Sequence, residues 1–277
     1  MNTIEPKTLA LTLLLTAIGC GPKVVPATSD YTDVNASVEP EVEEIELPSA
    51  DALFERNLQA MGGMEALEAA QSSSSVIRME IPLAGMSGTI SMISEEGRRL
   101  YVEHSLPGAT EGVTVVDGDT AWSIDSLMGP RLIEGDELRG LKMDNDPFAA
   151  ARHGDWYPTR ETLALTQFND EAAYQVSAST EWGKHDMLYF SVDSGLAIGS
   201  TTTETTAVGE MQITTTILEY ANFNGIIMPS VVSQTAGPMV INMTIESVEL
   251  NPVIDPALWV PPPEIVELIE EFQGSEE

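Results

Sequence analysis

The residue with the most distinctive chemical setting is Cys20, the only cysteine among the 277 residues. It follows an apolar run over residues 9–19, which is too short to cross a bilayer and is typical of a secretory signal. The residues directly before it are Ala17, Ile18 and Gly19, and such a small-residue pattern resembles the site at which a lipoprotein signal peptidase cuts. We therefore expect Cys20 to become an acylated N-terminus. The alternative is an ordinary signal peptide with an incidental cysteine.

The other side chains that could do chemistry form no catalytic or metal-binding motif. His104, His153 and His185 are the only histidines, and none stands at metal-ligand spacing. The acidic pairs at 117–119 and 144–146 lack the longer ligand series of a calcium loop, so a hairpin turn and a solvated loop are the simpler interpretation. Nucleophile elbows, phosphate-binding glycine loops and dinucleotide motifs are missing from the sequence. We expect no metal, no cofactor and no enzymatic activity.

The charge balance limits the partners of the chain. With 44 acidic and 12 basic residues, the formal net charge is −32. Such a charge repels phosphate backbones and anionic lipid surfaces, which excludes nucleic acid as a partner. Contact with a membrane is then expected through the N-terminal lipid anchor. The charge also favours a soluble monomer.

Composition divides the chain into a signal peptide (1–19), a linker (20–48) and one folded domain (49–273). The linker is acidic and is punctuated by Pro22, Pro26, Pro40 and Pro48, so it cannot bury enough apolar surface to fold. A linker of this length reaches on the order of 30 Å and would hold the domain clear of the lipid headgroups.

The folded part alternates apolar and polar residues along many short segments. Strands are expected at 77–83, 86–92, 100–106, 113–116, 120–124, 161–168, 174–180, 187–192, 196–206, 211–218, 226–234 and 239–246. Helical spacing appears only over 50–70, within the insert at 135–152, and after the prolines at 261–263. Because one face of the strands is apolar and helices are few, we predict a mainly β fold. Its single antiparallel sheet curves strongly into a half-barrel, with a helical lid over the apolar concave face.

The residues expected to line that concave face are mostly methionine and isoleucine. Flexible thioethers suit a pocket that accepts varied apolar ligands, because they repack around each of them. The candidates are Met79, Ile81, Met92, Phe190, Met211, Ile213, Met239, Ile241, Met243 and Ile245. The alternative interpretation is that these side chains simply fill an ordinary core.

Five segments in a fixed order carry a resemblance to a known group of proteins. They are 60–67 (AMGGMEAL), 117–122 (DGDTAW), 128–135 (MGPRLIEG), 189–196 (YFSVDSGL) and 220–229 (YANFNGIIMP). Over roughly residues 50–262 the chain resembles bacterial outer-membrane lipoprotein-sorting and carrier-like lipoproteins. The resemblance implies the half-barrel fold and the binding of lipid or acyl chains. It also implies a membrane-contact loop, which would fall at Leu106, and no arginine here matches the arginine that controls ligand entry in the carriers.

These observations give two functional hypotheses. The first is a non-catalytic lipoprotein of the cell envelope, in the outer membrane and facing the periplasm, that holds a lipid, an acyl chain or the lipid of another lipoprotein. The second is an envelope scaffold or protein-interaction module with the same fold and a filled core. They differ in whether the protein takes up lipid.

Overall fold

The computed structural model describes residues 46–95, 98–206 and 209–275. The signal peptide, Cys20 and nearly all of the linker lie outside these ranges, so those predictions remain predictions. Among the described residues, no helix is both long enough and apolar enough to cross a membrane.

Thirteen strands form one antiparallel sheet in the order β6-β5-β4-β3-β2-β1-β13-β12-β11-β10-β9-β8-β7. Their bounds are β1 (Ser72–Ile81), β2 (Met86–Glu95), β3 (Arg99–Leu106), β4 (Thr110–Asp117), β5 (Thr120–Asp125), β6 (Gly129–Leu132), β7 (Thr159–Phe168), β8 (Glu171–Ser179), β9 (His185–Ser191), β10 (Ala197–Thr206), β11 (Gly209–Phe223), β12 (Ile226–Ala236) and β13 (Met239–Leu250). The predicted mainly β fold with a single antiparallel sheet is confirmed. The degree of curvature stays a prediction.

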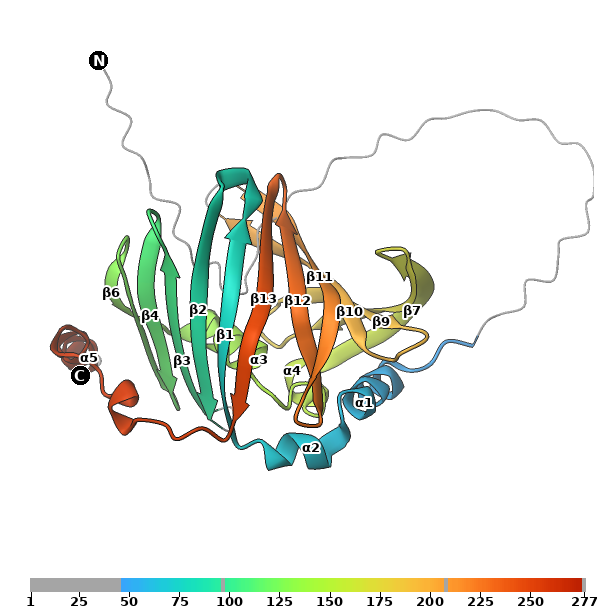
Figure 1. Ribbon diagram of the computed structural model, residues 1–277, viewed down its shortest axis with the longest axis horizontal. Coiled ribbons are helices and arrows are strands. Elements are labelled where there is room, and N and C mark those ends of the chain that lie inside the picture. The colour runs from blue at the N-terminus through green and yellow to red at the C-terminus, as the bar shows by residue number, and fades with distance from the viewer. Residues whose placement is uncertain (1–45, 96–97, 207–208, 276–277) are drawn as a thin grey trace, which may run out of the picture.

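The strand order dictates where the middle of the chain must run. All neighbours in the sheet are consecutive in sequence except β1 and β13, which join two successive meanders. Strands β6 and β7 are therefore opposite edges of the sheet although they follow each other in the chain. Residues 133–158, here called the crossing segment, connect these edges and contain α3 (Gly135–Asp144) and α4 (His153–Trp156). In Figure 1 both helices lie behind the sheet.

Helix α1 (Ala50–Ala60) begins where Ser49 accepts a hydrogen bond from the Ala52 amide at 3.2 Å. The helix ends before Gly62, whose φ of +119° and close approach to the Gly225 carbonyl leave no room for a side chain. Helix α2 (Gly63–Ala69) follows directly. In Figure 1, α1 and α2 run along one end of the strands.

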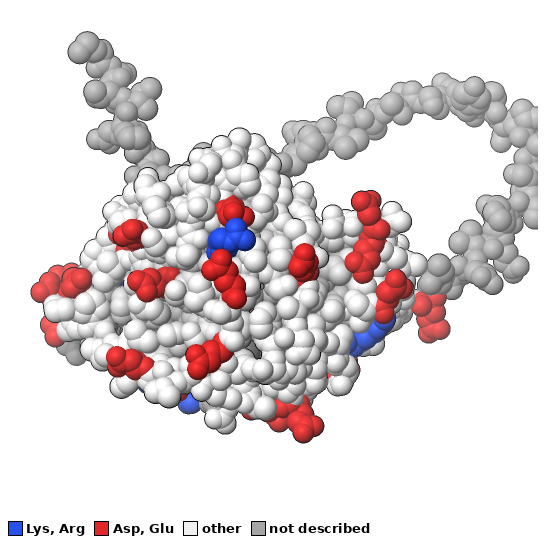
Figure 2. Space-filling view, viewed as in Figure 1, with Lys and Arg blue, Asp and Glu red and all other residues white. Residues whose placement is uncertain are grey.

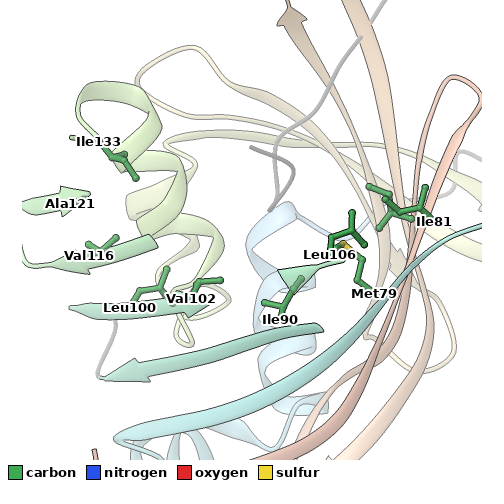
Figure 3. Packing of buried hydrophobic residues seen from close by; sticks show 10 residues of the cluster. Met79, Ile81, Ile90, Leu100, Val102, Leu106, Val116, Ala121 and Ile133 are labelled. Atoms are coloured by element: carbon green, nitrogen blue, oxygen red, sulfur yellow. The ribbon is translucent and has the colours of Figure 1, made fainter. Parts of the chain in front are cut away.

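The two faces of the β2–β6 half are covered by different parts of the chain. Because successive strand residues point to opposite faces, Val116 and Val115 belong to different clusters. Val116 packs with Ile133 and with Leu138 of α3, in the cluster drawn in Figure 3. Val115 packs instead with Trp259 of a 3-10 turn (Pro256–Trp259) and with α5 (Pro263–Ser275). The C-terminal helix therefore lies on the face opposite the crossing segment.

The outward face of the sheet's centre is polar. Arg78 of β1 pairs with Glu80 at 2.8 Å and with Glu246 of β13 at 3.2 Å. Figure 2 shows that this side of the molecule carries scattered carboxylates and few basic groups. The apolar side chains of β1 alternate with these charges and point inward, as the sequence pattern predicts.

Candidate functional site

A cavity of about 510 Å³ lies between the sheet, the crossing segment, and helices α1 and α2. Strands far apart in the sheet order, β2 and β9, contribute Met92 and Phe190 to the lining of this one cavity. Large apolar side chains from six elements are among its lining residues; they include Phe54, Met92, Met143, Trp156, Phe190 and Met228. A mostly apolar concavity of this volume lies within the ~300–1,000 Å³ typical of sites for small ligands.

Aromatic contacts hold α1 and α4 at one side of the cavity. The Phe54 ring stacks on His153 at 4.5 Å between centroids and meets Phe190 edge-on at 5.2 Å. His153 Nε2 lies 3.1 Å from Asp51 Oδ1, and Arg160 Nε donates to the same oxygen at 2.5 Å. The hydrogen bond from Arg160 lowers the pKa of the Asp51 carboxyl. These contacts connect α1, α4 and the edge strand β7.

The loop after α3 is fixed by a buried carboxylate. Asp146 accepts hydrogen bonds from the Phe148 amide and from Trp156 Nε1, both at 2.9 Å, and Arg152 Nη1 lies 3.2 Å away. The Asp146 side chain is only 2% exposed. Since all three donors belong to the crossing segment, Asp146 sets the shape of the wall that this segment gives to the cavity.

Two partly buried tyrosines complete the polar framework. The Tyr157 hydroxyl donates to Asp186 Oδ2 at 2.7 Å, and burial together with the charge of that carboxylate raises the pKa of Tyr157 well above its usual value. The Tyr220 hydroxyl donates to the Ala197 carbonyl at 2.5 Å, and burial raises the pKa of Tyr220 as well. Both phenols therefore stay protonated at physiological pH and act as hydrogen-bond donors.

Of the ten residues predicted to line a cavity, two do so, Met92 and Phe190. Met79 and Ile81 are buried beside Leu106 in the cluster of Figure 3, to which Ile241 also belongs. Met239 and Met243 pack against the same cluster. Met211 and Ile213 pack instead with Ala236. Ile245 is partly exposed. The inward face of the strands was predicted correctly, but most of it is filled by packed side chains.

The residue predicted for a membrane-contact loop is not exposed. Leu106 is 1% exposed and belongs to the same buried cluster as Met79 (Figure 3). The chain turns only after it, where the Ala109 amide donates to the Leu106 carbonyl at 2.9 Å. Its side chain therefore ends a strand inside the core, and the expected exposure of Leu106 was wrong.

The three histidines have separate local roles. His104 Nε2 lies 3.3 Å from Asp125 Oδ2, and the nearby Thr110 hydroxyl donates to that same carboxylate oxygen. His153 stacks on Phe54, and His185 Nε2 lies 3.0 Å from Ser177 Oγ. In the described part of the chain, no group of three or more His, Cys, Asp or Glu residues could hold a metal ion.

The sequence pattern missed the helical residues that shape the cavity. Phe54 lies on the apolar stripe of α1, but helical spacing does not reveal which strands that stripe will cover. Asp146 stands in an irregular stretch without periodicity. The close spacing of Asp144 and Asp146 was visible, although the solvated loop expected there contains a buried carboxylate instead.

Comparisons with known proteins agree on the fold. No family model and no curated protein matches the sequence. A LolA superfamily protein from Nitrosomonas europaea matches with a TM-score of 0.52 and 13% identity over 78% of this chain and 99% of that chain. An outer membrane lipoprotein-sorting protein domain from Vibrio parahaemolyticus gives 0.50 and 10% over 74% and 97%.

A DUF1329 family protein from Desulfovibrio piger is similarly close, with a TM-score of 0.53 and 10% identity over 76% of this chain and 96% of that chain. At these identities the likeness concerns the fold alone. Combined with the antiparallel sheet and the helices described above, it confirms the resemblance predicted from the sequence: the chain has the fold of the LolA superfamily and of outer membrane lipoprotein-sorting proteins.

Proposed function

We propose that this chain is a non-catalytic envelope lipoprotein that holds an acyl chain or lipid in the cavity between its sheet and its crossing segment. The observation that carries the proposal is the cavity itself, a concavity of about 510 Å³ with largely apolar walls. Burying methylene groups against such walls gains roughly 0.8 kcal/mol for each group, so a long alkyl chain gains binding free energy with every methylene that it buries there.

The setting of the domain supports the same proposal. The fold is shared with proteins described as sorting outer membrane lipoproteins, which makes the lipid anchor of another lipoprotein one ligand to test. Acylation at Cys20 would tether the chain to the outer membrane, and the linker at 20–48 would let the domain at 49–273 reach into the periplasm.

The test is the binding of the uncharged fluorescent probe N-phenyl-1-naphthylamine to the full chain carrying Cys20→Ser, which removes the expected acylation. The wild-type cavity should bind the probe and release it to an added dodecyl lipid. Met92→Trp places an indole in the cavity and should weaken binding by about tenfold or more, equivalent to at least ~1.4 kcal/mol.

Met128→Trp is the matched control, because Met128 is 49% exposed and does not line the cavity. An unchanged affinity in this control together with a loss in Met92→Trp supports the proposal. Equal affinity in both variants, or no binding by the parent chain, contradicts it.

The packed methionines favour a second candidate, an interaction module of the envelope with a filled interior. Eight of the ten predicted cavity residues do not line the cavity, and Met79 is only 3% exposed. This candidate predicts that the protein takes up no alkyl ligand and that its partners are other proteins.

A further inference from the structure

The charged residues of the cavity wall lie at one place, and their charge has one sign. Among the described residues that line the cavity, the charged side chains are the carboxylates of Asp144 and Asp146, and the lining includes no lysine, arginine or histidine. Asp144 is the last residue of α3 and Asp146 lies in the turn directly after it, so they lie together at the crossing segment. A ligand that enters the cavity therefore meets carboxylates and neutral groups only.

The cation that accompanies Asp146 lies outside the cavity. Arg152 Nη1 is 3.2 Å from Asp146 Oδ1, yet the Arg152 side chain is 47% exposed and lies over the Phe148 ring. Arg152 lines a separate depression together with Met64. It can neutralise Asp146 from outside but cannot reach a ligand inside the cavity without leaving these contacts.

The cation beside Asp144 is shared between two carboxylates. Lys184 Nζ lies 3.4 Å from Asp144 Oδ1 and 3.5 Å from Asp186 Oδ2. Asp186 also accepts the Tyr157 hydroxyl. With Asp146 and Arg152 included, three carboxylates share two cations among these described residues. An anion brought to the cavity wall here meets carboxylates that already engage both cations.

From this arrangement we infer that the cavity selects a single-chain amphiphile with an uncharged or cationic head group and discriminates against carboxylate- and phosphate-headed lipids. The inference rests on the proposed function and adds the class of ligand. An uncharged hydroxyl or amide can donate a hydrogen bond to the carboxylates at the wall, and a cationic head group is attracted to them by its charge, while an anion placed there is repelled in a partly desolvated site. Apolar walls bind the chain, and the acidic turn determines the head group.

The experiment displaces bound N-phenyl-1-naphthylamine from the full chain carrying Cys20→Ser, near neutral pH. The four competitors share a dodecyl or dodecanoyl chain and are used as monomers: monolauroylglycerol, dodecyltrimethylammonium, dodecanoate and dodecyl phosphate. We expect the first two to displace the probe at concentrations at least about tenfold lower than the two anions, since like charges brought together in an interface are strongly unfavourable.

Substitutions at Asp144 test whether the wall causes the discrimination. Asp144→Asn should bring the anions within about threefold of monolauroylglycerol, and Asp144→Glu, which keeps the charge, should preserve the difference. Glu264→Gln is the charge-matched control, because Glu264 is exposed on α5 at the opposite face of the sheet. Circular dichroism of each variant confirms that it is folded before it is scored.

The outcomes separate this inference from the proposed function. Probe binding with equal displacement by all four competitors, or with preference for the anions, overturns the inference and leaves the proposed function standing. Discrimination that survives in a folded Asp144→Asn protein also overturns it. If the probe does not bind at all, the proposed function fails, and the inference fails with it.

Discussion

Replacing Asp146 by alanine should loosen the crossing segment by an amount that can be worked out from its contacts. Its carboxylate is 2% exposed and accepts from the Trp156 indole and the Phe148 amide, both at 2.9 Å. Each donor left without a partner in a buried place costs ~1–3 kcal/mol. The half-exposed Arg152 can turn to water, so losing that ion pair adds ~0–1 kcal/mol. The free energy of unfolding should fall by about 2–4 kcal/mol, the lower part of the summed range, because water can enter and solvate some donors.

The assay is urea denaturation followed by tryptophan fluorescence and by circular dichroism, with the midpoint and slope compared between variants. Asp146→Asn keeps one acceptor oxygen and should cost less, about 1–2 kcal/mol. Asp155→Ala is the matched control, since Asp155 is an exposed acidic residue of the same segment and should change stability by less than ~0.5 kcal/mol. If Asp146→Ala were no more destabilising than this control, the assignment of Asp146 as the residue that fixes the cavity wall would be refuted.

Three further predictions concern other parts of the chain. Trp259→Ala removes a ring that is 7% exposed and lies under Arg99, so it should lower the free energy of unfolding by about 3–5 kcal/mol in urea denaturation. The affinity for the probe should stay unchanged, because Trp259 lies on the face of the sheet away from the cavity. Gly62→Ala should lower the free energy of unfolding by at least ~1–2 kcal/mol in the same assay, because the φ of Gly62 is +119° and a Cβ would lie 2.6 Å from the Gly225 carbonyl oxygen. An unchanged free energy of unfolding would contradict this backbone geometry. The lowered pKa of Asp51 means that its ionised form favours the folded state, so its contribution is present above the unfolded pKa of about 3.9 and is lost as the pH falls through the lower folded value. In thermal melts, Asp51→Asn should therefore be less stable than the parent at neutral pH and approach it below about pH 4, and a difference independent of pH would contradict this.

The regular part of the fold could be predicted from the sequence because alternation is a local signal. Met79 and Ile81 alternate with Arg78 and Glu80, and in the structure the first pair is buried while the second pair is on the outer face. Strand β6 was not predicted, because Gly129–Leu132 contains a proline and has only four residues, too few to show a period. It is an edge strand, where a missing backbone donor is tolerated.

The position of the cavity could not be predicted, because alternation identifies the inward face but not what covers it. The inner residues of β1 at the end near Ile81 pack beside Leu106 in a filled cluster (Figure 3), whereas Ser72 and Ser73 at its other end line the cavity. That difference depends on how the crossing segment passes over the sheet, which is decided by the pairing of β1 with β13. This pairing joins residues far apart in the chain, and no local pattern specifies it.

The placement of the C-terminal helix was also open. Its apolar stripe was visible, and the structure shows that Ile265 packs with Val115 and Trp122 on the face opposite α3. An apolar stripe on a helix indicates that a partner surface exists, but either face of a sheet could supply it. Val115 and Val116 are adjacent, apolar and both buried. Two neighbouring apolar residues in a strand are a local sign that this part of the sheet is buried on both faces.

The most direct test of the central claim is native mass spectrometry with lipid extraction on the chain expressed in the bacterial envelope with Cys20→Ser. We expect a population carrying one acyl lipid per chain, which disappears in Met92→Trp and persists in Met128→Trp. A mass free of lipid, with no uptake of added monolauroylglycerol by the folded protein, would contradict the claim that the cavity holds an alkyl chain.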